Sequence, residues 1–122
     1  MQTQPGVGAV LCDDLMFTSR ITGTARALGL EMRTCRTPAA LEALAAAQPL
    51  VCVLLDVHHA ELDVAALVPR LKADRACRVI AFGSHVAVDV LRAAQTAGCD
   101  VVLPRSQFVN QLATALPEWY SS

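Results

Sequence analysis

Three acidic residues follow apolar stretches of this 122-residue sequence and could form a reactive site. Asp13 and Asp14 come directly after the run VGAVLC, and Asp56 ends the run LVCVLLD. Carboxylates that lie close together raise one another's proton affinity unless a cation joins them. A hard divalent cation such as Mg²⁺ suits ligands that are all oxygen. An Asp beside such a cation, with a basic side chain such as Arg105 opposite, could accept a phosphoryl group, because both positive charges offset the developing negative charge.

The elements that must position these residues follow from the alternation of apolar runs with amphipathic segments. Short, mostly continuous apolar runs are typical of strands that are buried on both faces. Five such strands are predicted, at residues 7–12, 31–35, 50–56, 78–83 and 100–104. The intervening segments carry apolar residues at helical spacing, as residues 15–28 do, and are predicted to be helices.

Side chains that cap helices predict where four of the five helices begin. Thr37 is a predicted N-cap, and Pro38 occupies the first helical position, where proline is favoured. Asp63, Ser84 and Ser106 are predicted to cap the three helices that follow. Each predicted cap comes shortly after a predicted strand, so the connections are short.

The helix ends are marked by glycine and proline. Gly29 and Gly98 are predicted C-caps, because glycine adopts the left-handed conformation that often ends a helix. Pro49 follows the second helix, and Pro117 is expected to stop the last helix because proline lacks the N–H that a helix requires. Within the first helix, Gly23 weakens the helical propensity slightly.

Alternating strands and helices predict an α/β fold, a flavodoxin-like doubly wound (βα)5 domain. Right-handed crossovers would give a five-stranded parallel sheet of order 2-1-3-4-5. The chain, residues 1–122, is expected to be a single domain with its core at about residues 7–116. Ligands of such sheets bind at the carboxyl ends of the strands, beside the switch point between the first and third strands. Asp13, Asp14 and Asp56 are therefore predicted to converge there.

Composition excludes several classes of function. Ten basic and eleven acidic residues leave no excess charge to attract nucleic acid or an anionic membrane. No apolar run approaches the roughly 18 residues that span a bilayer, and the N-terminal MQTQPG does not have the pattern of a signal peptide. The protein is therefore expected in the cytoplasm, without direct contact with nucleic acid or membrane.

The five cysteines favour a structural role. They are odd in number and contain no C-x-x-C pair, so a disulfide framework or a zinc knuckle is a poor fit. Buried, small hydrophobic side chains in or beside strands are the expected role.

The acidic residues and their spacing resemble a known family, the receiver domains of two-component response regulators (the CheY-like superfamily). The resemblance rests on the segments VLCDDLMF, VLLDV and AGCDVVLPRSQF. It also rests on the spacing of Gly83 and Arg105, which are 22 positions apart. It implies that Asp56 is the phosphoacceptor. It also implies that Asp13 or Asp14, Asp56 and the backbone carbonyl of His58 bind Mg²⁺. A histidine kinase or an output protein would be the partner, and a homodimer is compatible with such a domain.

Several positions depart from the pattern of that family. Gly83 stands where the family has the Ser or Thr hydroxyl that follows the phosphoryl group, and Ser84 comes one residue late. Arg105 replaces a Lys, and its planar fork is not equivalent to a compact ammonium. Ser106 replaces a Pro, and Val102 replaces the aromatic switch residue. The half of the site that holds an acceptor and a metal is kept, whereas the half that reads the phosphoryl group is altered.

Three functions follow from this pattern. The preferred prediction is a stand-alone, atypical pseudo-receiver that signals by protein–protein contact, with weak, absent or non-standard phosphorylation at Asp56; it is not an enzyme beyond phosphoryl transfer to itself. A functional phosphoacceptor that uses Mg²⁺ in a phosphorelay is the second. A flavodoxin-like domain that binds a small ligand or a metal is the third.

Two further sets of residues carry predictions that stay open. His58, His59 and His85 lie on the same predicted edge and could join the carboxylates in a transition-metal site, although adjacent histidines point different ways. The contact surface for a partner is expected on the last strand and the last two helices. The residues suggested for that surface, several of which are equally explicable as core, are Val86, Val90, Leu91 and Phe108.

Overall fold

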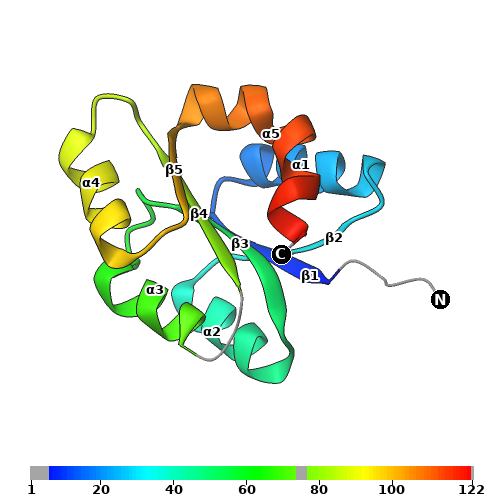
Figure 1. Ribbon diagram of the computed structural model, residues 1–122, viewed down its shortest axis with the longest axis horizontal. Helices are drawn as coiled ribbons and strands as arrows, with labels where there is room; N and C mark the ends of the chain where they lie inside the picture. The colour runs from blue at the N-terminus through cyan, green and yellow to red at the C-terminus, as the bar shows by residue number, and fades with distance from the viewer. Residues whose placement is uncertain (1–5, 74–76, 122) are drawn as a thin grey trace.

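A computed structural model describes residues 6–73 and 77–121 and contains five parallel strands that alternate with five helices (Figure 1). The strand order is β2-β1-β3-β4-β5, which confirms the predicted doubly wound fold. The strands are β1 (Val7–Leu11), β2 (Glu31–Cys35), β3 (Leu50–Asp56), β4 (Arg78–Gly83) and β5 (Val101–Pro104). The helices are α1 (Leu15–Ala27), α2 (Pro38–Ala47), α3 (Val64–Lys72), α4 (Val88–Ala97) and α5 (Arg105–Tyr120).

The sheet has a helical layer on each face, because successive strand residues point to opposite sides. Leu11 and Leu55 pair across β1 and β3 and belong to the core beneath α2, α3 and α4. Val10 and Leu54 pair one residue earlier and face α1 and α5. Figure 1 shows α1 and α5 together on one side of the sheet and α2 and α3 on the other. The apolar runs of β1 and β3 are thus explained by burial on both faces.

Two of the predicted N-caps are confirmed. The Thr37 hydroxyl accepts a hydrogen bond from the N–H of Ala40 at 3.1 Å, and Pro38 begins α2. The Asp63 carboxylate accepts one from the N–H of Ala66 at 3.2 Å. Each contact satisfies an N–H that has no partner within its helix.

The predicted caps at Ser84 and Ser106 are wrong. Helix α4 begins later than expected, at Val88, with Ala87 in the cap position and no side-chain cap. The Ser84 hydroxyl instead accepts a long hydrogen bond, 3.4 Å, from the N–H of Val86 in a local turn. Helix α5 begins earlier than expected, at Arg105, directly after β5, so Ser106 already lies within it.

The end of α5 also differs from the prediction, because the helix passes through Pro117 and continues to Tyr120. Both aromatic residues of the last turn are buried, Trp119 to 6% and Tyr120 to 7% exposure. The Tyr120 hydroxyl donates a hydrogen bond to the carbonyl of Glu31 at 2.5 Å. Burial of this aromatic surface outweighs the hydrogen bond that proline removes. The C-terminal turn therefore fastens α5 to β2.

The glycine and cysteine predictions agree with the structure. Gly29 and Gly98 have positive φ angles of 74° and 109° at the ends of α1 and α4. The cysteine side chains lie within or beside the sheet; Cys12, Cys35, Cys52 and Cys77 are buried, and Cys99 is half-buried.

Within the described ranges, no helix combines the length and apolar character needed to cross a bilayer.

Candidate functional site at the carboxyl ends of the strands

Asp56 is the last residue of β3 and lies in the middle of the sheet edge. It pairs with Phe82 of β4, and the preceding residue, Leu55, pairs with Leu11 of β1. Only 6% of Asp56 is exposed, which makes it the one buried carboxylate among the described residues. A buried carboxylate requires compensating donors or charges. Its surroundings therefore indicate what the site can do.

Three groups contact the Asp56 carboxylate. The backbone N–H of His58 donates to Oδ1 at 2.9 Å. The Cys12 thiol donates to Oδ2 at 3.5 Å. Burial, above all, raises the pKa of Cys12 to about 11, so the thiol stays protonated and can serve as the donor. The guanidinium Nη2 of Arg105 lies 3.6 Å from the same Oδ2.

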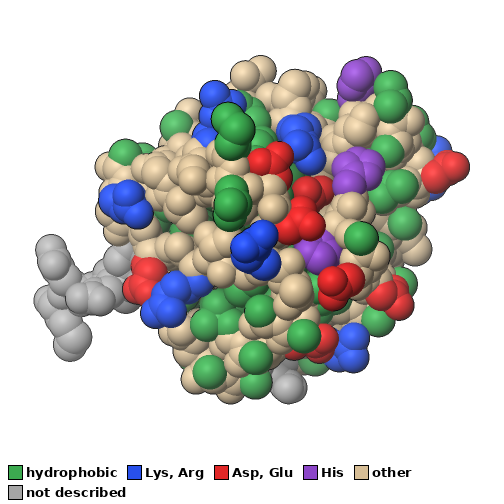
Figure 2. All heavy atoms as spheres, turned by 180° about the vertical axis from the view of Figure 1, so that it is seen from behind, with side chains coloured by type: hydrophobic (Ala, Val, Ile, Leu, Met, Phe, Trp, Pro, Cys, Tyr) green, Lys and Arg blue, Asp and Glu red, His purple; other side chains and the backbone are tan. Residues whose placement is uncertain are grey.

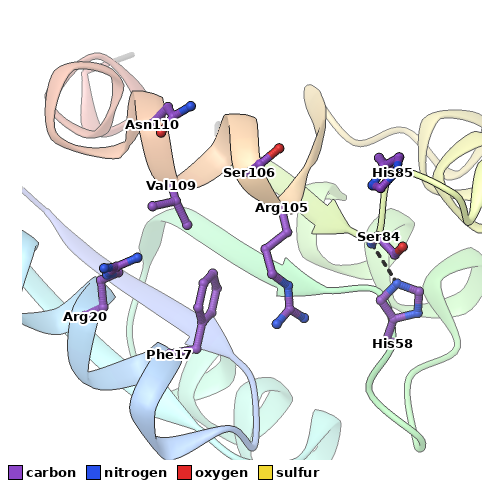
Figure 3. Close-up of a pocket in the computed structure, with 9 residues that line it drawn as sticks. All are labelled: Phe17, Arg20, His58, Ser84, His85, Arg105, Ser106, Val109 and Asn110. Atoms are coloured by element: carbon purple, nitrogen blue, oxygen red, sulfur yellow. Dashed lines mark hydrogen bonds between the residues drawn. The ribbon is translucent and has the colours of Figure 1, made fainter.

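Arg105 is held between this carboxylate and aromatic rings. Its guanidinium carbon lies 4.8 Å from the centre of the Phe17 ring and 5.9 Å from that of Phe82. The distance of 3.6 Å to Asp56 is too long for a strong hydrogen bond, so the contact is ionic. Figure 3 shows the Arg105 side chain extending from the start of α5 into the space between Phe17 and His58. Arg105 thus offsets the charge of Asp56.

The acidic pair after β1 is used differently by its two members. Asp14 caps α1, because its Oδ1 accepts hydrogen bonds from the N–H groups of Met16 and Phe17 at 3.1 and 3.2 Å. Asp13 is exposed. Among residues 6–73 and 77–121, no group of three His, Cys, Asp or Glu side chains is arranged to hold a metal ion. With Asp14 engaged as a cap and Arg105 beside Asp56, this arrangement fits a divalent cation poorly, and the magnesium site remains a prediction.

Gly83 ends β4 directly against the loop that follows Asp56. A Cβ atom at this position would lie 2.5 Å from Cγ2 of Val57 and 3.0 Å from Nε2 of His58. A Cβ contact of 2.5 Å essentially never occurs without displacement of one of the atoms, and a contact of 3.0 Å is tighter than nine in ten Cβ contacts in proteins. Packed interiors resist such displacement. There is consequently no room for a Ser or Thr side chain in the present arrangement.

His58 also binds the loop that follows Gly83. Its Nε2 accepts a hydrogen bond from the backbone N–H of Ser84 at 2.9 Å, drawn in Figure 3. A ring nitrogen that accepts a hydrogen bond carries no proton, so the neutral ring has its proton on Nδ1. One imidazole therefore fills the space at position 83 and ties the β3–α3 loop to the β4–α4 loop.

His59 has a separate, structural role. It is buried, and its Nε2 lies 2.6 Å from the carbonyl of Arg36, while its Nδ1 accepts the N–H of Glu61 at 3.1 Å. Both ring nitrogens are engaged with backbone groups, so neither is open to a metal. His59 fastens the β2–α2 loop to the β3–α3 loop.

A cavity of about 580 Å³ adjoins this site between α1, α5 and the loops after β3 and β4. Figure 3 shows the side chains around it. The lining residues are Phe17, Arg20, His58, Ser84, His85, Arg105, Ser106, Val109 and Asn110. The face turned away from the viewer of Figure 1 carries acidic, basic and histidine side chains side by side (Figure 2). That face has no basic stripe of the kind that binds nucleic acid.

Solved structures share this fold, whereas no family model matches the sequence and no curated protein is significantly similar to it. A response regulator from Thermotoga maritima has a TM-score of 0.80 at 14% identity, over 96% of this chain and 98% of that one. The receiver domain of NtrX from Brucella abortus has a TM-score of 0.79 at 18% identity, over 95% and 98%. The receiver domain of the Francisella response regulator 1452 has a TM-score of 0.78 at 16% identity, over 94% and 96%.

This chain has the receiver fold of response regulators. The receiver fold brings together most of the residues singled out from the sequence. Asp56, Arg105 and His58 contact one another or share the cavity, and Gly83 and Ser84 lie against His58. Asp13 and Asp14 lie at the same edge, but Asp14 is turned into its helix cap. The resemblance to receivers at the level of fold is thus confirmed, while the chemistry of Asp56 is untested.

The residues around the site that sequence reasoning missed are Cys12, Phe17 and Arg20. Cys12 was expected only as a small core residue, and Phe17 only as part of a helix face. Phe17 and Arg20 are three residues apart on α1, a spacing that puts both on one side of a helix. That spacing, with a strand end close by, was the available signal.

Of the residues suggested for the partner surface, Phe108 is wrong. Its side chain is fully buried and stacks on Phe82, with the two ring centres 4.4 Å apart.

Proposed function

We propose that this chain is a receiver-type signalling domain of an atypical kind, which passes its signal by contact with another protein. Phosphorylation of Asp56 is weak, absent or non-standard in this proposal. The receiver fold supports the signalling role. The altered surroundings of Asp56 support the atypical behaviour.

The observation that carries the proposal is the contact between Gly83 and His58. In the family that the chain resembles, a hydroxyl at the end of the fourth strand moves toward the phosphoryl group. Gly83 has no hydroxyl, and the imidazole of His58 and the Val57 side chain fill the adjoining space. The N–H of Ser84 is already bound by His58. These contacts favour a β4–α4 loop whose position does not depend on a phosphoryl group.

The contact between Arg105 and Asp56 adds a second reason. A guanidinium 3.6 Å from Oδ2 balances the carboxylate charge and stands close to where a cation would bind. It is also stacked near Phe17 at 4.8 Å, which adds about 0.5–1 kcal/mol at such partly exposed sites. A phosphoryl group on Asp56 would have to displace the Arg105 guanidinium from both contacts. Phosphorylation of Asp56 is therefore disfavoured.

The surface proposed for a partner is the exposed apolar patch at the start of α4. Val86, Val88 and Val90 are 74%, 54% and 37% exposed. Leu91 is half-buried and contributes more to the core than to this patch. A histidine kinase or an output protein is the expected partner, and a homodimer through the same face is the alternative, which sedimentation would distinguish.

A conventional phosphoacceptor is the second candidate function. It is favoured by the place of Asp56 at the end of β3, beside β1, where a receiver holds its acceptor. Incubation with Mg²⁺ and a small phosphodonor, followed by intact mass measurement, separates the two. The proposal predicts little or no phosphate-sized adduct. A stoichiometric adduct that is lost in Asp56→Asn would favour the conventional phosphoacceptor instead.

A further inference from the structure

The cavity beside Asp56 extends well beyond the carboxylate itself. Asp56 is not among the residues that line it; Arg105 stands between the carboxylate and the cavity. From Arg105 the cavity continues along α1 to Arg20 and along α5 to Asn110 (Figure 3). Its volume of about 580 Å³ is within the range of pockets that hold small organic molecules. A phosphoryl group on Asp56 would leave most of it empty.

The charged side chains that line the cavity are all basic. Arg20 enters from α1 and Arg105 from α5, and none of the lining residues within the described ranges is Asp or Glu. Arg20 forms no ion pair with another residue of the described part of the chain. Arg26, Arg36 and Arg92 likewise form no ion pair within the described residues, so the feature that distinguishes Arg20 is its place in the cavity wall. A guanidinium without an acidic partner, facing a cavity, is suited to a carboxylate, sulfonate or phosphate group.

The remaining walls supply apolar surface and neutral hydrogen-bonding groups. The Phe17 ring and Val109 form the apolar part, between the two arginines. His85, Ser106 and Asn110 offer polar groups at the rim. An aromatic ring beside a guanidinium favours a flat ligand that can stack on it. The cavity thus combines a stacking wall with two cations.

We propose that this cavity binds a small organic anion, a flat apolar body that carries one carboxylate, sulfonate or phosphate group. The flat body lies against Phe17 and Val109, and its anionic group is bound by Arg20, at the end of that apolar wall opposite Arg105. The inference stands apart from the proposed signalling function, since it needs no phosphorylation of Asp56.

The test uses two naphthalene probes of similar shape and different charge. 1-Anilinonaphthalene-8-sulfonate is the anion, and N-phenyl-1-naphthylamine is its neutral counterpart. Fluorescence titration of the full chain is expected to show one saturable site for the sulfonate and weaker binding of the amine. Arg20→Gln is expected to lower the affinity for the sulfonate about three- to tenfold, as the loss of a partly exposed charged contact implies. The affinity for the amine should stay unchanged. Amide shifts should locate the probe at Phe17, Val109 and Asn110.

A matched control variant distinguishes the loss of a contact in the cavity from a general loss of positive charge. Arg26→Gln removes the same charge from the exposed last turn of the same helix, outside the cavity, and is expected to have no effect. Three outcomes would each overturn the proposal. They are no saturable binding of the sulfonate, equal losses of affinity in Arg20→Gln and Arg26→Gln, and amide shifts centred on the α4 patch instead of Phe17. None of these readouts depends on whether a phosphodonor labels Asp56.

Discussion

The imidazole of His58 occupies the space that a side chain at position 83 would need. Its Nε2 would lie 3.0 Å from a Cβ atom on Gly83, and the same atom accepts the N–H of the next residue, Ser84, at 2.9 Å. Cγ2 of Val57 would come closer still to that Cβ, at 2.5 Å, so the glycine leaves room for both side chains. The absence of a side-chain hydroxyl at Gly83, together with this contact, is the basis of the proposed atypical function.

Replacement of Gly83 by alanine is predicted to destabilise the protein. The new methyl group would meet Val57 at 2.5 Å and His58 at 3.0 Å, and overpacking of this kind costs about 1–3 kcal/mol. Urea unfolding measures the loss. Gly23→Ala is the matched control: nothing lies within 4 Å of its Cβ in the exposed middle of α1, so it should stabilise by about 0.5–1 kcal/mol. Equal effects of the two substitutions would contradict the packing described for Gly83.

Removal of the Arg105 charge is predicted to make Asp56 a better ligand for a cation. Arg105→Gln takes away the positive charge 3.6 Å from Oδ2. Because the pair is partly exposed, the variant should bind Mg²⁺ about two- to fivefold more tightly than the wild type, whose affinity is expected to be weak. Calorimetric titration with Mg²⁺ checks it, with Arg92→Gln on the exposed side of α4 as the control. Unchanged affinity in Arg105→Gln would show that the guanidinium does not compete with the cation.

The hydroxyl of Tyr120 is predicted to stabilise the junction of α5 with β2. It donates to the carbonyl of Glu31 at 2.5 Å, and burial, above all, raises the pKa of Tyr120, so the phenol remains a donor at any ordinary pH. Tyr120→Phe should lower the free energy of unfolding by about 1 kcal/mol. A denaturation midpoint equal to that of the wild type would argue against this contact.

The carboxylate of Asp100 is predicted to make stability fall in acid. Burial alone would raise its pKa, but the hydrogen bonds from Lys72 at 2.6 Å and from the N–H of Val79 at 2.8 Å outweigh this and lower it. A lowered folded-state pKa means that the stabilisation is complete above the unfolded value of about 3.9 and is lost as the pH falls through the folded value.

Asp100→Asn tests that dependence on pH. The variant should be less stable than the wild type near pH 7, and the difference between the two should shrink as the pH is lowered through about 4 and below. Urea midpoints at several pH values measure it. Glu61→Gln, an exposed carboxylate, is the control and should leave the profile unchanged. A constant difference between Asp100→Asn and wild type at all pH values would contradict the assigned role.

The fold could be predicted from the sequence because its signals are local and repeated. The apolar run at Leu50–Asp56, the Thr37 cap and the positive-φ glycines each depend on a few neighbouring residues. The errors occurred where distant contacts override local preference. Helix α4 begins at Val88 instead of directly after Ser84, whose N–H is bound by His58, 26 residues away. Proline 117 does not end α5 because Trp119 and Tyr120 are buried.

The candidate site was predictable in its members and not in its contacts. Strand-end position places Asp56 and Arg105 at the same edge of the sheet, since Asp56 ends β3 and Arg105 follows β5, with β4 between these two strands. Asp14 stands directly before the first helix, the same N-cap pattern as Asp63, so its role as a cap could have been predicted. No sequence pattern indicates that the Cys12 thiol faces Asp56 or that Arg105 lies between Asp56 and Phe17. These depend on side-chain orientation, which the spacing of residues does not determine. The same limit hid the pairing of Gly83 with His58.

The most direct test of the central claim is the response of the β4–α4 loop when Asp56 is offered a phosphodonor with Mg²⁺. Amide shifts of residues 84–87 are compared with those of His58, in the wild type and in Asp56→Asn. The amide signals of residues 84–87 are expected to stay unchanged because the imidazole of His58 holds the loop. Large shifts that spread from Ser84 into α4 and β5, and that disappear in Asp56→Asn, would contradict it.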